Sequence, residues 1–536
     1  MKKRALISVF VKDGVLELAQ FLDSKGWEIL STGGTASYLS KNGVPVTDVS
    51  SVTGFPECLD GRVKTLHPFI HAGLLARRDD KSHMDTIKNL GVQPIDLVCV
   101  NLYPFFEKVQ AGLSFTETVE FIDIGGPTML RSAAKNFQDV IVLTDPADYS
   151  EVISCLSSTS SSVPGDIQMS IPLELKKRLA GKVFNLTSAY DAAVSRFMLE
   201  EELPHYYNLS LVKGQSLRYG ENGHQKASLY LTADRKGAFG GMKQLQGKEL
   251  SYNNIRDLDV AWKAVCAFNK HVKNAKPVDG ISFADAAGSV FTVALKHNTP
   301  CGAALGDSVV ESYRKTYNCD PVSIFGGIIG CSTIIDKEAA EEMVQCFLEV
   351  IVAPGFTPDA LQVFSAKKNL RIVTAEVNAD DEWECTSVDG GILVQNRDTV
   401  LFEKWQVVTR AQPTRSQIDE MAFGMTVAMF AKSNAIVVVK NRAAIGIGCG
   451  QTNRIWAASQ ALERAKAVTD KEKISNAEVM ISDAFFPFCD CVEEAAKYGI
   501  KAIIQPGGSM RDQESIDAAD RLGIAMVFTG ARHFKH

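Results

Sequence analysis

The first 198 residues alternate short apolar runs with stretches of helical hydrophobic periodicity. The apolar runs are ALISVF, WEIL, DLVCVNLY and DVIVLTD, and the helical segments include VLELAQFLDSKG and PTMLRSAAKN. Strands that alternate with helices in this way are typical of a mostly parallel sheet covered by helices on both faces. The pattern therefore predicts a doubly wound α/β domain.

The rest of the chain predicts a second, larger domain. The acidic and proline-interrupted stretch LEEELPHYYNLS resembles a linker, so we expect domains at 1–198 and 199–536. The second domain is also α/β in pattern. Within it, TVALKHNTPCGAAL and AIVVVKNRAAIGIGCGQTNRIWAASQAL each run from an apolar strand through a glycine-containing turn. This shared layout suggests two similar α/β halves.

Composition restricts the class of protein. The chain has 536 residues, of which 46% are hydrophobic and 22% charged, and a formal charge of −6. The negative charge argues against a general nucleic-acid or membrane-surface binder. Lys12 and Asp13 interrupt the first apolar run, so we expect a buried strand there and no signal peptide. Because the cysteines are scattered and no apolar run reaches about 20 residues, we expect a soluble, cytoplasmic protein with reduced thiols.

The pair Pro300-Cys301 first suggests a zinc deaminase. That site needs H-x-E together with P-C-x-x-C. The chain has no C-x-x-C, and His297 is followed by Asn298 and Thr299, so the glutamate is missing. We therefore expect no metal requirement, and we interpret Cys301 as a small buried residue at a tight turn.

Four segments of the first domain carry polar groups suited to an anionic small molecule. STGGTASYL places Thr32 and Thr35 at the start of a helix, which suits a phosphate, although a threonine-capped turn is the plainer interpretation. In DGRVKTLHP, Arg62 and Lys64 point the same way if the segment is extended. NLYPF and FIDIGGPTMLRSAAKN add polar groups at a strand end and a helix start, where open α/β sheets bind ligands.

These four motifs together resemble the bifunctional AICAR transformylase/IMP cyclohydrolase family, and the resemblance runs along the whole chain. It implies a methylglyoxal-synthase-like first domain and a second domain of two cytidine-deaminase-like α/β/α halves. It also implies transfer of a formyl group from the reduced folate 10-formyltetrahydrofolate to AICAR, followed by closure of formyl-AICAR to IMP with loss of water. Members are homodimers with shared transformylase sites, so a homodimer is expected.

Ring closure joins an unreactive amide nitrogen to a formyl carbon, and it needs proton transfer and stabilisation of an oxyanion. The resemblance implies that Lys64, Tyr103, Asp123 and Lys135 are catalytic. Phe10 departs from the family, in which serine is frequent at this position. The residues that the resemblance implies for substrate binding are Ser8, Lys12, Thr32, Gly33, Gly34, Thr35, Arg62, Asn101, Ile124, Gly125 and Gly126.

The stretch LKHNTPCG places Lys296 and His297 at the end of an apolar run. The resemblance implies that His297 is the acid/base group of formyl transfer, that Lys296 orients it, and that Asn434 donates to the formyl oxygen. A structural histidine is the alternative. Gly223 stands where the family more often has proline. The residues implied for substrate binding are Arg218, Tyr219, Asn254, Phe325, Gly326, Glu349, Arg454, Phe486, Phe488 and Arg532, with core packing as the alternative for at least one phenylalanine.

Two other functions compete with a bifunctional enzyme. One is an enzyme that retains a single activity, and the other is a regulatory protein that binds purine precursors without turnover. A sensor needs phosphate contacts but has no use for Lys64, Lys296 and His297 in the same chain. The presence of all three favours the bifunctional enzyme.

Overall fold

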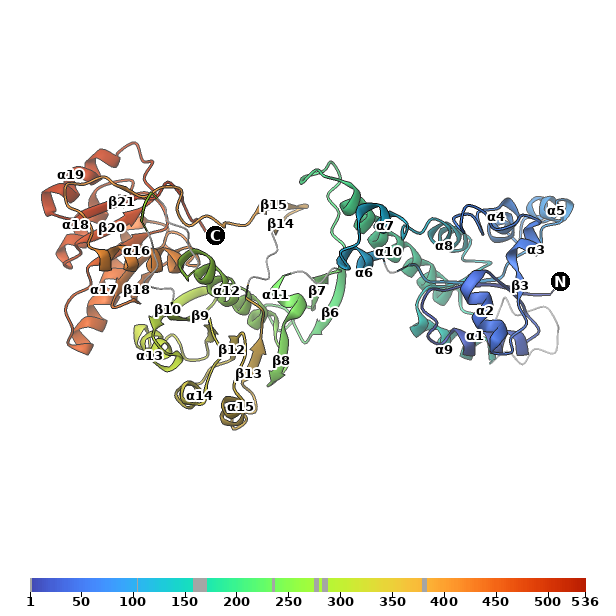
Figure 1. Ribbon diagram of the computed structural model, residues 1–536, viewed down its shortest axis with the longest axis horizontal. Helices are drawn as coiled ribbons and strands as arrows, with labels where there is room; N and C mark the ends of the chain where they lie inside the picture. Colours follow the sequence, from blue (N-terminus) through green and yellow to red (C-terminus); the bar gives the residue numbers. More distant parts are fainter. Residues whose placement is uncertain are drawn as a thin grey trace. The chain divides into compact units, whose positions relative to one another are not determined.

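The computed structural model describes residues 2–103, 105–157, 171–233, 237–273, 279–281, 288–377 and 383–536. The chain divides into two compact units, Met1–Leu211 (unit 1) and Val212–His536 (unit 2) (Figure 1). Among the described residues, no helix is both long enough and apolar enough to cross a membrane.

Unit 1 is built on a sheet of five parallel strands. Their order across the sheet is β3 (Thr47–Asp48), β2 (Glu28–Ser31), β1 (Arg4–Ser8), β4 (Leu97–Val100) and β5 (Ile141–Leu143). The apolar residues of the three central strands are almost fully buried, as expected for a parallel sheet with helices on both faces. The predicted doubly wound sheet is confirmed. Its strand order reverses between β1 and β4, and ligands of such sheets bind at this switch point.

The helices of unit 1 connect and cover these strands. They are α1 (Val15–Ser24), α2 (Gly33–Lys41), α3 (Val49–Thr53), α4 (Pro68–Leu75), α5 (Lys81–Asn89), α6 (Phe105–Gln110), α7 (Phe115–Val119), α8 (Gly125–Lys135), α9 (Tyr149–Ser157) and α10 (Leu173–Met198). α10 packs against α8 and β5 and buries Leu179 and Val183 in the core. The start of α8 is thereby held close to the carboxyl edge of the sheet.

Unit 2 contains a twelve-stranded sheet in two halves of the same topology. From one edge to the centre the order is β8 (Lys243–Gln246), β13 (Arg371–Thr374), β12 (Val350–Ala353), β11 (Ile328–Cys331), β9 (Val290–Lys296) and β10 (Thr299–Gly306). From the centre to the other edge it is β18 (Ala443–Gly448), β17 (Ile436–Lys440), β19 (Val479–Ser482), β20 (Ala502–Gln505), β21 (Ala525–Phe528) and β16 (Gln406–Val407).

Each half contains an antiparallel hairpin, three strands that are parallel to one another, and an antiparallel edge strand. The hairpins β9–β10 and β17–β18 meet at the centre, where Ala304 pairs with Ala443. The suspected pair of similar α/β halves is confirmed, because strand order and direction repeat. Two further hairpins, β6 (Leu211–Leu217) with β7 (Ala227–Thr232) and β14 (Trp383–Val388) with β15 (Gly391–Asn396), lie outside the large sheet.

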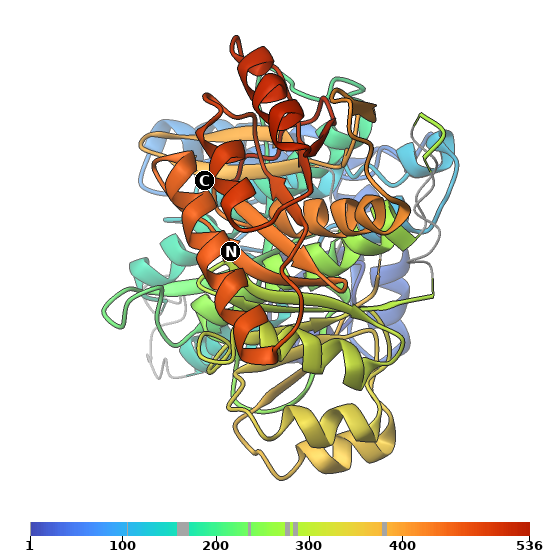
Figure 2. The same cartoon turned by 90° about the vertical axis from the view of Figure 1, so that its left-hand side faces the viewer.

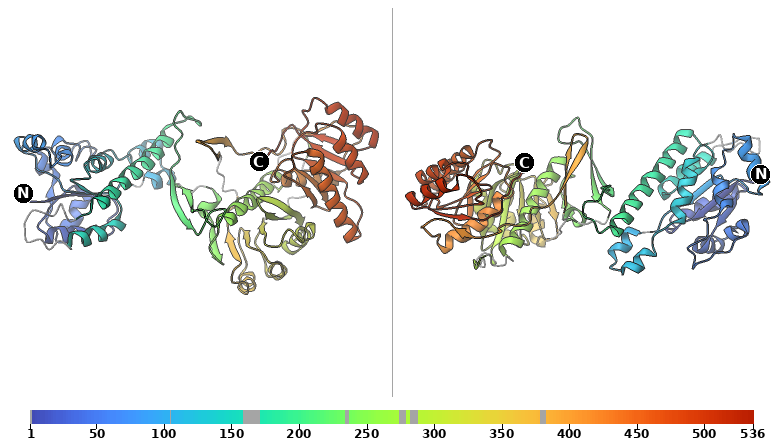
Figure 3. Two further views of the ribbon diagram at one scale, coloured as in Figure 1. Left: turned by 180° about the vertical axis from the view of Figure 1, so that it is seen from behind. Right: turned by 90° about the horizontal axis from the view of Figure 1, so that it is seen from above.

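Helices cover both faces of this sheet (Figures 1 and 3). α12 (Tyr252–Phe268) and α16 (Arg415–Ala428) share one core with one face of both halves. The opposite face packs against α13 (Val309–Cys319), α14 (Lys337–Met343) and α15 (Pro358–Phe364) in the first half. In the second half, orange to red in Figure 2, it packs against α17 (Arg454–Glu472), α18 (Asp490–Lys497) and α19 (Asp512–Leu522). A short helix, α11 (Ala238–Gly241), precedes β8.

Candidate active sites

At the switch point of unit 1, Asn101 joins the segments that follow β1 and β4. Its Oδ1 accepts hydrogen bonds from the N–H groups of Phe10 (2.5 Å) and Val11 (3.2 Å), and its Nδ2 donates to the Val11 carbonyl (3.0 Å). The ring of Phe10 packs edge-on against that of Tyr103, with centroids 5.5 Å apart. Phe10, the departure from the family pattern, is therefore a neighbour of a predicted catalytic residue.

The start of α2 presents open N–H groups at the same edge of the sheet. Thr32, at the N-cap, makes no side-chain capping bond, and the two glycines after it are exposed. Thr35 is buried and donates to the Val9 carbonyl at 2.9 Å. Lys12 Nζ donates to Thr35 Oγ1 at 3.2 Å, and burial lowers the pKa of Lys12.

Lys64 lies beside the start of α2, and Thr65 lies beside the start of α8. A Cβ atom on Gly33 would lie 3.5 Å from Lys64 Nζ, and one on Gly125 would lie 3.1 Å from Thr65 Oγ1. Lys64 also forms an ion pair with Glu57 at 3.0 Å. An ammonium group beside an uncapped helix N-terminus attracts an anion, and this arrangement suits a phosphate.

Asp123 is held at the start of α8. Its carboxylate accepts hydrogen bonds from the N–H groups of Gly126 (2.8 Å) and Tyr103. The N–H of Asp123 itself donates to the hydroxyl of Tyr190 at 2.8 Å. Burial raises the pKa of Asp123, and the two N–H groups oppose that rise. A half-buried carboxyl group with a raised pKa at a helix start is suited to proton transfer.

Other predicted residues of unit 1 lie further out. Lys135 is exposed at the last position of α8, about 15 Å along the helix axis from Gly125. Arg62 is exposed and pairs with Glu120. Ile124 is exposed, and Ser8 is half-buried at the end of β1. The structure thus brings Lys64, Tyr103 and Asp123 to one edge of the sheet but leaves Lys135 at the opposite end of α8.

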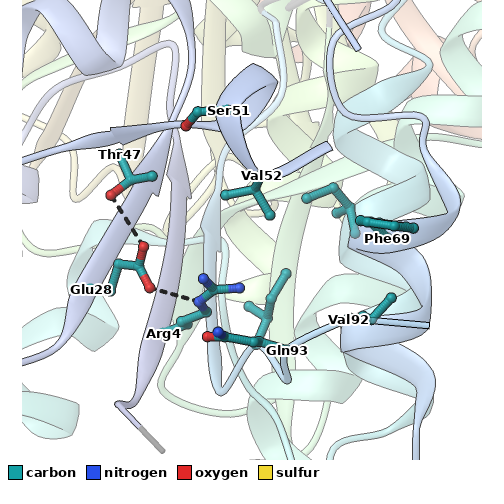
Figure 4. A pocket seen from close by; sticks show the side chains of 11 residues that line it. Arg4, Glu28, Thr47, Ser51, Val52, Phe69, Val92 and Gln93 are labelled. Atoms are coloured by element: carbon teal, nitrogen blue, oxygen red, sulfur yellow. Dashed lines mark hydrogen bonds and ion pairs between the residues drawn. The ribbon is translucent and has the colours of Figure 1, made fainter. Parts of the chain in front are cut away.

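A separate cavity of about 230 Å³ lies near the amino ends of β1, β2 and β3 (Figure 4). Arg4 Nε donates to Glu28 at 2.7 Å, and the other carboxylate oxygen of Glu28 accepts from Thr47 at 3.2 Å. The predicted site residues do not line this cavity. The candidate site and this cavity therefore belong to different regions of unit 1.

In unit 2, Lys296 and His297 lie at the turn of the β9–β10 hairpin. Lys296 pairs with Thr299, which leaves His297 and Asn298 as a two-residue turn with φ of 56° and 61°. A non-glycine residue in this left-handed region costs about 1–2 kcal/mol. Asp257 of α12 accepts hydrogen bonds from the N–H groups of Asn298 (2.6 Å) and His297. Hydrogen bonds to a charged group contribute about 1.5–3 kcal/mol each, so they offset the strain.

The second half contains the same device at the β17–β18 turn. Lys440 pairs with Ala443, and Asn441 and Arg442 form the turn with φ of 53° and 60°. Glu420 of α16 accepts from the N–H groups of Arg442 (3.4 Å) and Asn441. We call this the sister turn. Its two N–H groups are also bound by a carboxylate from a helix, but neither of its residues is a histidine.

Two further predicted residues gather around Lys296. Lys296 Nζ donates to the carbonyl of Phe325 at 2.7 Å. The Phe325 ring is 59% exposed and packs against Phe347, with centroids 5.2 Å apart. Gly326 adopts φ of 73° and donates its N–H to the Phe347 carbonyl at 2.7 Å. Lys296, Phe325 and Gly326 therefore form one cluster with an exposed aromatic ring.

Asn434, just before β17, is held by Arg454. Arg454 Nη2 donates to Asn434 Oδ1 at 2.6 Å, while Nη1 donates to Asp483 (2.5 Å) and Ser482 (2.9 Å). Asn434 Nδ2 donates to the Gln451 carbonyl at 2.8 Å. Arg454 was expected to bind substrate, but it is only 6% exposed, and both Nη groups donate to protein side chains. In this structure its guanidinium group holds the side chain of Asn434 in place.

Thr299 connects the two halves beside the His297 turn. Its Oγ1 accepts from the N–H of Lys432 at 3.4 Å and lies 3.5 Å from Cys449 Sγ. Lys432 precedes Asn434 by two residues. The His297 turn and the segment that carries Asn434 therefore lie at the same edge of the sheet.

The remaining predicted side chains of unit 2 are partly engaged elsewhere. Asn254 Oδ1 accepts from Ser251 in the capping box at the start of α12. Glu349 forms an ion pair with the buried Arg371 at 2.6 Å. The guanidinium groups of the exposed Arg218 and Arg532 each lie over a neighbouring aromatic ring, Tyr219 at 5.0 Å and Phe534 at 4.5 Å.

The two predicted phenylalanines near residue 487 differ. Phe486 is fully buried in a hydrophobic core, so the packing alternative applies to it and its expected ring contact with substrate is not available in this structure. Phe488 is 51% exposed, with Arg511 over its ring at 4.9 Å. Cys301 was expected to be buried at a tight turn, but it lies partly buried in strand β10, just after the turn. Desolvation raises the pKa of its thiol to about 12, which disfavours the reactive thiolate.

Sequence reasoning missed Asp257, Asp483 and Tyr190. Asp257 follows Asn254 by three residues, within the segment GKELSYNNIRD. Nothing local in the sequence links it to His297, which lies 40 residues further along.

Comparisons with known proteins cover the whole chain. The family model "AICARFT/IMPCHase bienzyme" matches residues 133–464, and "MGS-like domain" matches residues 14–128. Two relatives called "Bifunctional purine biosynthesis protein PurH", from Clostridium acetobutylicum and Clostridium botulinum (strain 657), are 57% and 54% identical over 100% of both chains. A solved structure, "Crystal structure of ForH", is 36% identical over 36% of this chain and 96% of that chain, with a TM-score of 0.33.

The first match confirms the resemblance seen in the motifs, and the second confirms the methylglyoxal-synthase-like character of the first domain. The relatives match from end to end, so no part of the chain falls outside the similarity. The chain belongs to the AICARFT/IMPCHase bienzyme family.

Proposed function

We propose that the chain catalyses two successive steps of purine biosynthesis. It transfers the formyl group of 10-formyltetrahydrofolate to the 5-amino group of AICAR, and it closes formyl-AICAR to IMP with loss of water. Full-length similarity to proteins named as bifunctional supports both activities. The observation that carries the proposal is the presence of one polar cluster suited to proton transfer in each unit, around Asp123 and around His297.

In formyl transfer, the amine nitrogen attacks the formyl carbon and the carbonyl oxygen becomes an oxyanion. His297 takes the proton that the amine loses, and Lys296 stabilises the negative charge. The tetrahedral intermediate then collapses: the bond between the formyl carbon and N10 of the folate breaks, and the imidazolium of His297 returns the proton to N10 so that tetrahydrofolate leaves. Asn434 uses one amide N–H for Gln451 and keeps the other for the formyl oxygen. The exposed ring of Phe325 lies beside Lys296 and offers an apolar surface to the folate or the AICAR ring.

In ring closure, the carboxamide nitrogen attacks the formyl carbon and the resulting tetrahedral carbon loses water. Asp123 and Tyr103 carry protons, and Lys64 stabilises the developing oxyanion. The start of α2, with Lys12 and Thr32, holds the 5′-phosphate. We also propose that the protein acts in the cytoplasm and as a homodimer, which sedimentation at assay concentrations can test.

The two activities can be separated by single substitutions. His297→Ala abolishes the formation of tetrahydrofolate and leaves the closure of supplied formyl-AICAR intact. Lys64→Ala abolishes closure and leaves formyl transfer intact. Lys440→Ala, at the position in the sister turn that matches Lys296, leaves both rates unchanged and is the control.

Each competing function gives a different result in this assay. A single-activity enzyme converts only one of the two precursors before any substitution is made. A sensor binds AICAR without turnover. A folded variant that lost both activities would contradict the assignment of the two reactions to separate sites.

A further inference from the structure

We infer that Asp257 is a positioning residue for formyl transfer: by accepting hydrogen bonds from both N–H groups of the His297–Asn298 turn, it fixes the backbone from which the His297 imidazole projects at the edge of the sheet. The inference rests on the proposed function, in which His297 is the acid/base group. Asp257 acts through the turn and does not itself touch the reacting atoms.

Asp257 is held more rigidly by the fold than the His297–Asn298 turn is. α12 begins at a complete capping box formed by Ser251 and Asn254, and Asp257 follows one turn later. The next residue, Leu258, is fully buried, and α12 packs against β9 and β11. The half-buried carboxylate is therefore attached to a rigid element, whereas the His297 side chain is exposed at the tip of a hairpin.

The contacts at the turn are short and charged. Asn298 N–H meets the Asp257 carboxylate at 2.6 Å, and the His297 N–H donates to the same carboxylate. Two consecutive left-handed residues other than glycine keep this backbone conformation only when their surroundings hold it. His297 is one of these two residues, so the carboxylate that restrains the turn also fixes the direction of the Cα–Cβ bond that carries the imidazole.

Comparison with the sister turn distinguishes a positioning role of Asp257 from purely structural support of a hairpin turn. Glu420 makes the corresponding contacts with Asn441 and Arg442, and that turn carries no histidine. Loss of either carboxylate should loosen one hairpin turn. Only the loss of Asp257 should disturb an acid/base group.

The test measures kcat and KM for both reactions in the full-length protein. In Asp257→Ala, kcat for formyl transfer falls by about 100-fold, the loss expected from a misplaced catalytic group. KM for AICAR changes by less than about threefold, because binding contacts are unaffected. Ring closure of supplied formyl-AICAR keeps its rate, since its site lies in unit 1. Glu420→Ala leaves kcat of both reactions within about twofold of the parent.

Two conservative variants complete the series. Asp257→Glu recovers at least about tenfold of the lost kcat, because a glutamate makes the same contacts at the sister turn. Asp257→Asn keeps one acceptor oxygen and has intermediate activity, and it replaces Asp257→Ala if that variant does not fold.

The outcomes that overturn the inference are specific. A folded Asp257→Ala or Asp257→Asn with the parental kcat for formyl transfer removes the positioning role. An equal loss of transfer in Glu420→Ala, or an equal loss of ring closure in Asp257→Ala, assigns Asp257 to general structural support. The proposed function is tested separately, by the unsubstituted protein alone. If that protein transfers no formyl group, the proposed function is wrong, whatever the variants do.

Discussion

Arg454 and Asn434 are joined by a hydrogen bond of 2.6 Å between Nη2 and Oδ1, and the same guanidinium binds the fully buried Asp483 at 2.5 Å. The link connects the core of the second half of unit 2 with the amide that we expect to meet the formyl oxygen. Arg454 therefore has two separable effects, one on stability and one on the direction of Asn434.

Arg454→Met leaves the Asp483 carboxylate buried without its cation, so the free energy of unfolding of unit 2 falls by about 3–5 kcal/mol. The double variant Arg454→Met/Asp483→Leu recovers most of this loss, because no charge is then left unpaired. Formyl transfer stays slow in both, since Asn434 has lost its support. Denaturant titration and kcat measurements check this, and a double variant with parental transfer activity would contradict it.

Asp123→Asn should change both ring closure and the pH dependence of stability. Burial raises the pKa of Asp123 from 3.8, so the folded protein binds this proton more tightly than the unfolded chain does. Stability from this group is therefore greatest below the unfolded value and falls as pH rises through the folded value. The asparagine variant lacks this decline, so its stability relative to the parent increases from about pH 4 upward.

The same variant loses ring closure by about 10²–10⁴-fold if Asp123 transfers a proton. Formyl transfer, assayed in the same preparation, is unchanged. Unfolding midpoints measured from acid to neutral pH test the first expectation, and rates with supplied formyl-AICAR test the second. A pH-independent difference in stability between variant and parent would show that Asp123 has an ordinary pKa.

Gly448→Ala should destabilise unit 2 through overpacking. A Cβ at this position would lie 2.0 Å from the Ala457 carbonyl oxygen, so α17 would have to move away from β18. Such overpacking costs about 1–3 kcal/mol, and more when backbone must shift. Gly181→Ala in α10 is the control, because its Cβ meets nothing within 4 Å. That control gains about 1 kcal/mol from helix propensity, and thermal unfolding distinguishes the two.

Phe486 and Phe488 should respond in opposite ways to replacement by alanine. Phe486 is fully buried, so Phe486→Ala costs about 3–5 kcal/mol of stability. Phe488 is 51% exposed, so Phe488→Ala leaves stability nearly unchanged and raises KM for AICAR or the folate. Calorimetry together with steady-state kinetics checks both, and an unchanged KM in Phe488→Ala would remove that residue from the site.

Much of the fold and part of the candidate site follow from local sequence. The alternation of apolar runs and helical segments is enough to predict the parallel sheet of unit 1, because buried strands and amphipathic helices have different hydrophobic periods. The shared layout around Lys296 and Lys440 anticipates the two halves of unit 2. The family resemblance implies Lys64, Tyr103, Asp123 and Lys135 as one group; the first three lie at one edge of the sheet of unit 1, whereas Lys135 lies at the far end of α8.

Tertiary structure alone decides which distant side chains restrain the predicted ones. Asp257 supports the His297 turn, Asp483 engages Arg454, and Tyr190 accepts from the Asp123 backbone, across separations of 29 to 67 residues. It also decides that Phe486 is core and Phe488 is exposed, although both follow the same strand. Periodicity is a property of neighbouring residues, whereas these contacts depend on how helices pack on a sheet assembled from remote segments.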